Sequence, residues 1–363
     1  MIMKNDAKAI RYMYQHEPRM FFRLAFRALH PHIQYQHNWS IDVLGEALAR
    51  CHRGETKRLI INMPPRSLKS ICTSVAFPAW VLGVRPESKI MCVAGHRGLV
   101  NEHHDLTRNL MDHPRYRSLF PHVRVQESTS TLKLAQGGSR AGFTPSGAIT
   151  GRGADFIIID DPQSAHEADD SMKTLSIHNW FDRNIYQRLD SKHDGVIIVA
   201  MQRLAEDDLT GHLLKQENWE VLSLAAIATD DEYHPKSLGG QLVRKKGEAL
   251  HPAREDQEQL RAAMERMGAR AFMSQYQQQP YAAGQGEGRG GAFHMASYAD
   301  ASPEECKGSC TFFALIPEEH YVLDRVFGER TCIRPGTAPA LSNKEWAEKF
   351  GKMVHADGWL SDE

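Results

Sequence analysis

Short runs of apolar residues recur along residues 58–224, and stretches with helical spacing separate them. The runs cover residues 59–61, 89–94, 156–159, 196–200 and 219–224. Strands that are apolar on both faces are typical of parallel sheets covered by helices on both sides. The pattern therefore predicts an α/β fold with a central, mostly parallel sheet flanked by helices. In such folds ligands bind at the carboxyl ends of the strands, and we expect the polar residues discussed below to lie there.

The first run leads into a segment with the layout of a phosphate-binding loop. Two prolines, Pro64 and Pro65, end the strand because proline cannot donate a hydrogen bond to a neighbouring strand. Lys69 and Ser70 then begin a segment that we expect to be helical up to Pro78. A loop of this kind binds phosphate through backbone N–H groups and a helix N-terminus, while a lysine neutralises charge and a hydroxyl ligates magnesium.

The loop departs from the usual pattern at two positions. Met63 and Leu68 stand where phosphate-binding loops have glycines, which let the backbone approach phosphate closely and adopt positive φ angles. Considered alone, the segment fits an ordinary strand, loop and helix equally well.

Two acids end the third run. Asp160 and Asp161 follow four apolar residues and precede Pro162, which ends the strand. In nucleotide hydrolases, an acid at the tip of such a strand holds Mg²⁺ through water, and the next acid positions or deprotonates the attacking water. A buried strand that ends in a solvated Asp-Asp-Pro turn is the alternative. Lys-Ser and Asp-Asp at the ends of two apolar strands, in this order, favour an ATPase.

Three further residues occupy positions that suit a nucleotide site. Arg152 lies between two glycines before the acidic strand, where it could reach a phosphate of its own or of a neighbouring subunit; an exposed turn arginine is the alternative. Gln202 follows the fourth run and could sense the γ-phosphate. Trp39, upstream of the loop, could hold an adenine ring or anchor the core. His103 and His104 are adjacent in a helical stretch and face different sides, so we expect no metal site there.

The composition excludes several classes of protein. With 41% hydrophobic and 25% charged residues, the 363-residue chain resembles ordinary soluble globular proteins. A net charge of −1 excludes a uniformly basic nucleic-acid coat, so contacts with DNA must come from local patches. The six scattered cysteines indicate a reducing compartment without disulfides. No apolar run approaches the roughly 20 residues of a membrane span, so we expect a cytosolic protein.

Four segments in this order resemble the large subunit of tailed-phage terminases, the ATP-driven motors that pump DNA into a procapsid. The matching segments are residues 62–70, 150–162, 201–211 and 272–280. The resemblance extends over residues 34–293. In this family a proline-proline-arginine loop is a familiar variant of the phosphate-binding loop.

The resemblance implies a role in nucleotide binding for several residues. Lys69 would bind the β- and γ-phosphates of ATP, and Ser70 would ligate Mg²⁺. Arg66 would contact the γ-phosphate region, and Trp39 resembles part of the adenine-side motif. The loop residues that complete this set are Pro65, Ser67 and Leu68.

The resemblance also implies roles in hydrolysis. Asp160 is the expected magnesium-side acid. Asp161 stands where the family often has a catalytic glutamate, and its side chain is shorter. Arg152 is similar in position to an arginine finger that acts on a neighbour's ATP in a ring, and Gln202 matches the coupling motif.

The resemblance predicts four regions: an N-terminal helical segment of the ATPase (1–50), a P-loop ATPase core (51–228), a linker or subdomain (229–292), and a truncated nuclease-like remnant with a tail (293–363). Only about 70 residues follow the boundary segment, so a complete ribonuclease-H-type nuclease does not fit. Asp300 and Asp324 are isolated acids in that region. We therefore expect the nuclease activity to be lost.

The resemblance implies the partners as well. They are double-stranded DNA, the portal protein, a terminase small subunit and further copies of the chain in a ring, with no membrane. The location would be the bacterial host cytoplasm and, transiently, the procapsid portal. The alternatives are a helicase-like DNA-remodelling ATPase and an inactive prophage remnant.

Overall fold

The computed structural model describes residues 11–126, 131–147, 149, 151–216, 218–235, 241–280, 311–316, 319–326 and 329–333. The chain divides into two units. The first comprises Met1–Asp230 and Lys245–Gly291, and the second comprises Asp231–Arg244 and Ala292–Glu363. The expected region 229–292 is therefore shared between the two units.

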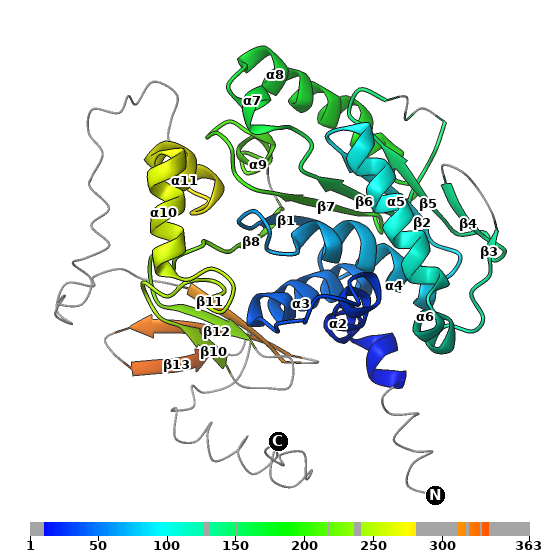
Figure 1. Ribbon diagram of the computed structural model, residues 1–363, viewed down its shortest axis with the longest axis horizontal. Coiled ribbons are helices and arrows are strands. Elements are labelled where there is room, and N and C mark those ends of the chain that lie inside the picture. Colours follow the sequence, from blue (N-terminus) through cyan, green and yellow to red (C-terminus); the bar gives the residue numbers. More distant parts are fainter. Residues whose placement is uncertain are drawn as a thin grey trace, which may run out of the picture. The chain divides into compact units, whose positions relative to one another are not determined.

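The first unit is built on an eight-stranded sheet in the order β3-β4-β5-β2-β6-β7-β1-β8 (Figure 1). Its strands are β1 (Arg58–Asn62), β2 (Lys89–Ala94), β3 (Val125–Gln126), β4 (Thr131–Leu134), β5 (Ser139–Phe143), β6 (Phe156–Asp160), β7 (Val196–Met201) and β8 (Glu220–Ser223). The pairs from β5 to β8 are parallel, while β3-β4 and β4-β5 are antiparallel. The predicted α/β fold with a mostly parallel sheet is confirmed.

Helices cover both faces of this sheet, which explains the apolar runs (Figure 1). One face packs against α2 (Pro18–Leu29), α3 (Trp39–Arg53), the π-helix η1 (Ile71–Ala76), α4 (Phe77–Val84), α5 (Arg97–Asp112) and α6 (Pro114–Leu119). The other face packs against α8 (Ser171–Trp180), η2 (Phe181–Ile185) and α9 (Leu209–Leu213). The remaining helical elements are α7 (Ala165–Ala168), η3 (Tyr186–Arg188), α10 (Gln257–Met267) and α11 (Ala269–Gln275).

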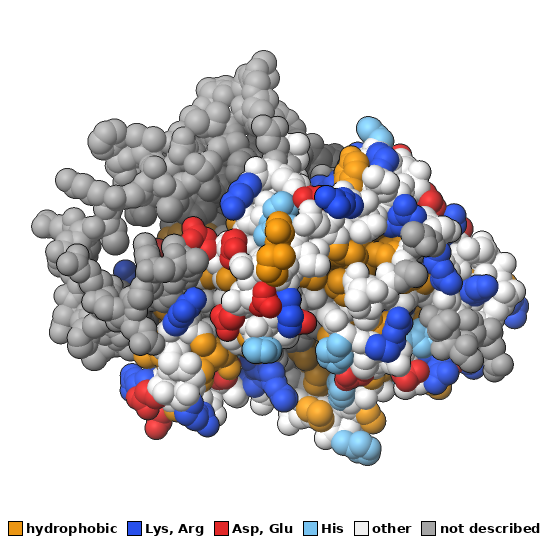
Figure 2. Space-filling view, turned by 90° about the horizontal axis from the view of Figure 1, so that it is seen from above, with side chains coloured by type: hydrophobic (Ala, Val, Ile, Leu, Met, Phe, Trp, Pro, Cys, Tyr) orange, Lys and Arg blue, Asp and Glu red, His pale blue; other side chains and the backbone are white. Residues whose placement is uncertain are grey.

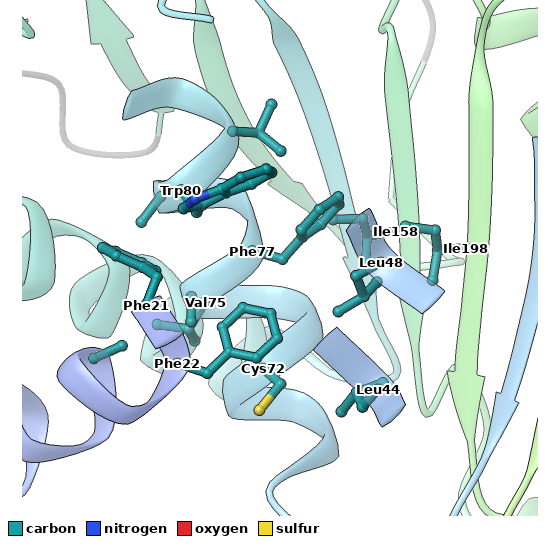
Figure 3. Packing of buried hydrophobic residues seen from close by; sticks show 14 of the residues in the cluster. Phe21, Phe22, Leu44, Leu48, Cys72, Val75, Phe77, Trp80, Ile158 and Ile198 are labelled. Atoms are coloured by element: carbon teal, nitrogen blue, oxygen red, sulfur yellow. The ribbon is translucent and has the colours of Figure 1, made fainter. Parts of the chain in front are cut away.

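Successive residues of each central strand enter different hydrophobic clusters because side chains alternate across a strand. Ile158 and Ile198 belong to the first cluster, whereas Ile157 and Ile197 belong to the second. Figure 3 shows Leu48 and Phe77 beside Ile158 and Ile198 in the first cluster. Each fully buried side chain of this size stabilises the fold by roughly 1.5–3 kcal/mol.

The helix that follows Lys69 and Ser70 does not end at Pro78, and that expectation is wrong. The wide π turn of η1 precedes the proline, and α4 continues to Val84. In the π turn the N–H of Phe77 donates to the carbonyl of Cys72, five residues earlier. A proline inside a helix removes one N–H donor and crowds the preceding turn, and the widened turn accommodates both effects.

The described part of the second unit is antiparallel. A hairpin joins β9 (Glu232–Pro235) to β10 (Gln241–Arg244), and a three-stranded sheet has the order β11 (Thr311–Ile316), β12 (Glu319–Val326), β13 (Glu329–Ile333). Asp324 lies on β12. Asp300 lies outside the described residues.

Hydrophobic and basic side chains are exposed side by side on the surface of the first unit. Seen from the side that α8 occupies, hydrophobic side chains lie beside Lys and Arg side chains (Figure 2). Met172 and Leu175 of α8 are 73% and 51% exposed, and Leu214 after α9 is 47% exposed. No helix of the described residues is long and apolar enough to cross a bilayer.

Candidate nucleotide-binding site

The loop between β1 and the following helix has the backbone conformation that glycine usually provides. Leu68 has φ of 63° and Arg66 has φ of 59°. A left-handed conformation costs a non-glycine residue about 1–2 kcal/mol, so the surrounding structure must maintain it. The Leu68 side chain packs against the first hydrophobic cluster, and its carbonyl accepts from the N–H of Cys72 at 2.9 Å. The missing glycines therefore do not prevent a tight loop.

Lys69 and Ser70 follow this loop and meet the two acids at the end of β6. Lys69 is 6% exposed, and its ammonium donates to Asp161 Oδ1 at 2.7 Å. The Ser70 hydroxyl donates to Asp160 Oδ1 at 3.1 Å. Although β7 separates β1 from β6, the carboxyl ends of the three parallel strands meet at one edge. The structure thus brings four predicted residues into one hydrogen-bonded group.

Asp160 is a fully buried carboxyl group. Ser74 donates its hydroxyl proton to Oδ2 at 3.0 Å, so both carboxyl oxygens accept from serines of the same helix. Burial, followed by the nearby charge of Asp161, raises the pKa of Asp160 to about 6. His103 Nε2 lies 3.8 Å from Oδ2, but burial lowers the pKa of His103 to about 4. This histidine is therefore neutral at pH 7 and does not offset the carboxylate charge.

Asp161 is held in a strained conformation at the junction of three segments. Its φ is 40°, outside the usual range for a residue with a side chain. Its N–H donates to the carbonyl of Ala200, and Oδ1 accepts from the N–H of Gln202 at 3.2 Å as well as from Lys69. A β-carbon at Gly95 would lie 2.7 Å from the Asp161 carbonyl oxygen. The ends of β2 and β7 thus fix this carboxylate.

Gln202 contacts the site through its backbone N–H. The side chain of the next residue, Arg203, forms its hydrogen bonds outside the site. Arg203 donates from Nε to both carboxyl oxygens of Asp208, at 3.1 and 3.0 Å, and Asp208 is fully buried. The N–H of Arg203 donates to Gln278 Oε1 at 2.9 Å. The segment after β7 therefore connects the acids to the segment 272–280 named above.

The remaining predicted residues form no hydrogen bond with this group that involves their side chains. The Ser67 hydroxyl donates to the carbonyl of Pro64 at 2.7 Å, and Pro65 is half-buried. Arg66 is exposed, and its carbonyl accepts from Arg254. Trp39 is half-buried at the start of α3 and packs against the first cluster. Its role in binding adenine stays a prediction.

Arg152 does not lie at the carboxyl ends of the strands, and that expectation is wrong. It precedes β6, so its backbone is at the amino end of the strand whose carboxyl end carries Asp160. The guanidinium donates to Thr131 Oγ1 at 3.2 Å and lies 5.6 Å from the centre of the Phe143 ring. These contacts are at the β4-β5 edge. Within this chain Arg152 is therefore separate from Lys69.

Sequence reasoning missed three buried polar residues beside the site. Ser74 is one helical turn after Ser70, and this spacing alone would have suggested it because residues four apart share a helix face. His103 was considered only as a partner of His104. Arg140, on β5, is 1% exposed and donates from Nη2 to the carbonyl of Ser74 at 2.9 Å. Nothing in the local sequence around Arg140 indicates that contact.

The donor atoms fit magnesium bound together with phosphates. Within the described residues, no group of three or more His, Cys, Asp or Glu side chains could hold a metal ion by itself. Mg²⁺ prefers hard oxygen ligands and is commonly held by one or two carboxylates together with substrate phosphates and water. The Ser70 hydroxyl and the Asp160 carboxylate, 3.1 Å apart, offer hard oxygen atoms of this kind.

Comparisons with known proteins find similarity in structure. No protein-family model matches the chain, and no curated protein sequence matches it. The ATPase domain of the Thermus phage P74-26 large terminase is similar, with a TM-score of 0.44 and 15% identity over 69% of this chain and 95% of that chain. The large terminase of bacteriophage D6E in complex with ADP has a TM-score of 0.42 and 9% identity, over 85% of this chain and 73% of that chain. The large terminase of bacteriophage HK97 has a TM-score of 0.38 and 14% identity, over 54% of this chain and 41% of that chain. At these identities the likeness concerns the fold alone.

Proposed function

We propose that the chain is an ATP-hydrolysing motor subunit that translocates double-stranded viral DNA into a procapsid. One observation carries the ATPase part: Lys69 and Ser70 of one strand-loop-helix unit share a hydrogen-bonded group with Asp160 and Asp161 of another strand end. The packaging part rests on the four sequence segments that resemble terminase large subunits.

The contacts indicate how the site would bind ATP. Lys69 is paired with Asp161, so the phosphates would compete with that carboxylate for the ammonium. Ser70 and Asp160 would hold magnesium, which neutralises charge on the β- and γ-phosphates when it is bound. Asp161, once released from Lys69, would accept a hydrogen bond from the attacking water. The Gln202 N–H would keep that carboxylate in place.

The same proposal extends to partners that the resemblance implies. The subunit would act as a homo-oligomeric ring on the portal protein, together with a terminase small subunit and double-stranded DNA, in the host cytoplasm. Arg152 would act on the ATP of a neighbouring subunit.

The test of the proposal is ATP turnover measured with and without double-stranded DNA. We expect Lys69→Ala to lower turnover by at least about 100-fold, because a preorganised positive charge on the transferred phosphate is lost. Lys173→Ala, which removes an exposed lysine of α8, is the matched control and should turn over ATP like the wild type.

Three results would contradict the proposal. Full activity of Lys69→Ala would refute the site. Separation of duplex strands would favour a helicase-like enzyme, since a packaging motor moves intact duplex. Absence of hydrolysis by the wild type, with or without DNA, would favour an inactive prophage remnant.

A further inference from the structure

The first two residues after β7 have backbone N–H groups that the sheet no longer pairs. The pairing of β7 with both neighbouring strands ends at or before Met201. Gln202 and Arg203 follow and are half-buried, so their N–H groups need acceptors from elsewhere. Both acceptors are side-chain oxygens. Asp161 Oδ1 accepts from Gln202 at 3.2 Å. Gln278 Oε1 accepts from Arg203 at 2.9 Å.

Gln278 occupies a buried and strained position in the segment after α11. It is 6% exposed, and its φ of 58° is a left-handed conformation that is unfavourable for a residue with a side chain. Its Nε2 also donates to the carbonyl of Gln275 at 2.6 Å. That carbonyl needs a donor and the Arg203 N–H needs an acceptor, so one orientation of the amide satisfies both. The surrounding structure therefore holds this side chain in place despite the backbone strain.

The preceding glutamine forms an equivalent contact with a different strand end. Gln277 is 2% exposed, and its Oε1 accepts from the N–H of Ile227 at 2.8 Å while its Nε2 donates to the carbonyl of Ile227 at 2.9 Å. Ile227 follows β8, which β1 separates from β7. The next glutamine, Gln279, is exposed. Of three consecutive glutamines, only Gln278 therefore contacts the loop after β7, and the other two are matched controls.

The loop after β7 connects Gln278 to the carboxylate of Asp161. The N–H groups of Gln202 and Arg203 belong to consecutive planar peptide groups, so only the two torsion angles of Gln202 relate them. Asp161 Oδ1 accepts from Lys69 as well as from Gln202. Once phosphates draw Lys69 away, the Gln202 N–H would be the remaining donor to this carboxylate among the described residues. Its position then decides the orientation of the acid.

We propose that Gln278 is a positioning residue for hydrolysis. It holds the loop after β7 so that the Gln202 N–H keeps the Asp161 carboxylate oriented toward the attacking water. The part of the carboxylate in hydrolysis rests on the proposed function, whereas the dependence of the Gln202 hydrogen bond on Gln278 does not. The site then includes a residue 75 positions after Arg203.

Amide hydrogen exchange, measured by NMR on ¹⁵N-labelled protein, tests this dependence without any ligand. We expect Gln278→Met to speed exchange of the Gln202 N–H by about 10-fold, although Gln278 does not itself contact that group, because the loop is no longer held. Gln277→Met should speed exchange at Ile227 and leave Gln202 as in the wild type. Gln278→Glu keeps an acceptor for Arg203 and should protect the Gln202 N–H better than Gln278→Met does.

Two exchange results would overturn the proposal. One is wild-type protection of the Gln202 N–H in Gln278→Met. The other is an equal loss of this protection in Gln277→Met, which would mean that any loosening of the segment has the same effect.

ATP turnover tests the consequence for hydrolysis. We expect Gln278→Met to lower kcat by about 10–100-fold, because a small displacement of a reacting group can cost about 100-fold. Affinity for a fluorescent, non-hydrolysable ATP analogue should stay as in the wild type, since Lys69 and the loop before it are intact. Gln277→Met and Gln279→Met should keep the wild-type kcat. A loss of analogue affinity with kcat unchanged would overturn the positioning role.

A double-mutant cycle separates this role from a general loss of structure. Asp161→Asn should itself lower kcat, and adding Gln278→Met should lower it no further, because the carboxylate that Gln278 positions is absent. Additive losses would overturn the proposal. If the wild type hydrolyses no ATP while exchange at Gln202 depends on Gln278 as expected, only the proposed function is refuted.

Discussion

Asp160 lies in an environment unlike that of an ordinary exposed acid. A fully buried carboxylate is unfavourable unless it is hydrogen-bonded, and here two serine hydroxyls serve that purpose. Its neighbour Asp161 adds a second negative charge, which Lys69 balances. With two acids and one lysine, the site therefore favours a further positive charge.

The pH dependence of stability should reveal this buried acid. The pKa of Asp160 is raised from 3.8 to about 6, so between these values the folded chain holds more protons at this site than the unfolded chain. The contribution of Asp160 to the free energy of unfolding therefore falls as the pH rises through this window. We expect Asp160→Asn, which does not titrate, to gain stability relative to the wild type over that window and to keep a constant difference above it.

Urea unfolding of both proteins between about pH 4 and pH 8 measures this difference. His103 and His52, whose pKa values are lowered to about 4, titrate in both proteins, so the comparison largely removes their contributions. If the difference in the free energy of unfolding between Asp160→Asn and the wild type stays constant or shrinks as the pH rises, the raised pKa of Asp160 is contradicted.

Prediction at the scale of residues succeeded where a residue type and its place at a strand end were enough. Lys69, Ser70, Asp160 and Asp161 were expected to meet, and they do. Arg140 could not be predicted, because its contact with the Ser74 carbonyl depends on the packing of η1 over β5. The catalytic roles of the predicted residues stay predictions.

At the scale of elements, the turn after β2 is packed tightly against the acidic strand end. Gly95 permits the close approach of the Asp161 carbonyl, where a β-carbon would lie 2.7 Å from the oxygen. The neighbouring atom belongs to the backbone and cannot rotate away. This turn therefore supports the position of Asp161 from the side opposite β7.

Substituting this glycine should destabilise the fold. We expect Gly95→Ala to lower the free energy of unfolding by about 1–3 kcal/mol, the typical cost of overpacking a filled space. Gly98→Ala is the matched control: its nearest neighbour is the His96 imidazole at 3.2 Å, which must shift by only a few tenths of an ångström, and alanine favours helix α5, in which it lies. Urea unfolding followed by tryptophan fluorescence measures both, and equal midpoints would contradict the prediction.

The apolar runs predicted the central strands well, because burial on both faces leaves a clear pattern. They did not predict that β7 lies between β1 and β6, since strand order depends on contacts between distant segments. The helix through Pro78 was also missed. Proline usually ends a helix, and here the wide π turn before it accommodates the ring, so the helix continues.

At the scale of the whole molecule, the direction of the strands separates Arg152 from the acids. In a parallel sheet a residue just before a strand and a residue at its end lie at opposite edges. Arg152 precedes β6 and Asp160 ends it. A role for Arg152 in hydrolysis therefore requires the nucleotide of another subunit.

Mixing two inactive variants tests this role. We expect Arg152→Ala to lose ATP turnover in assembled rings, and a mixture of Arg152→Ala with Lys69→Ala to regain part of it. In the mixture, an intact Arg152 from one chain can face an intact Lys69 site of another. Turnover in rings of Arg152→Ala alone that equals the wild type would remove the residue from the mechanism.

The hydrogen bond between Arg140 and the Ser74 carbonyl has a consequence for the evolution of related sequences. The Ser74 hydroxyl donates to Asp160, so the arginine, the serine and the acid are linked although they are far apart in the sequence. Homologues that keep the serine and the acid should therefore keep a donor side chain at position 140.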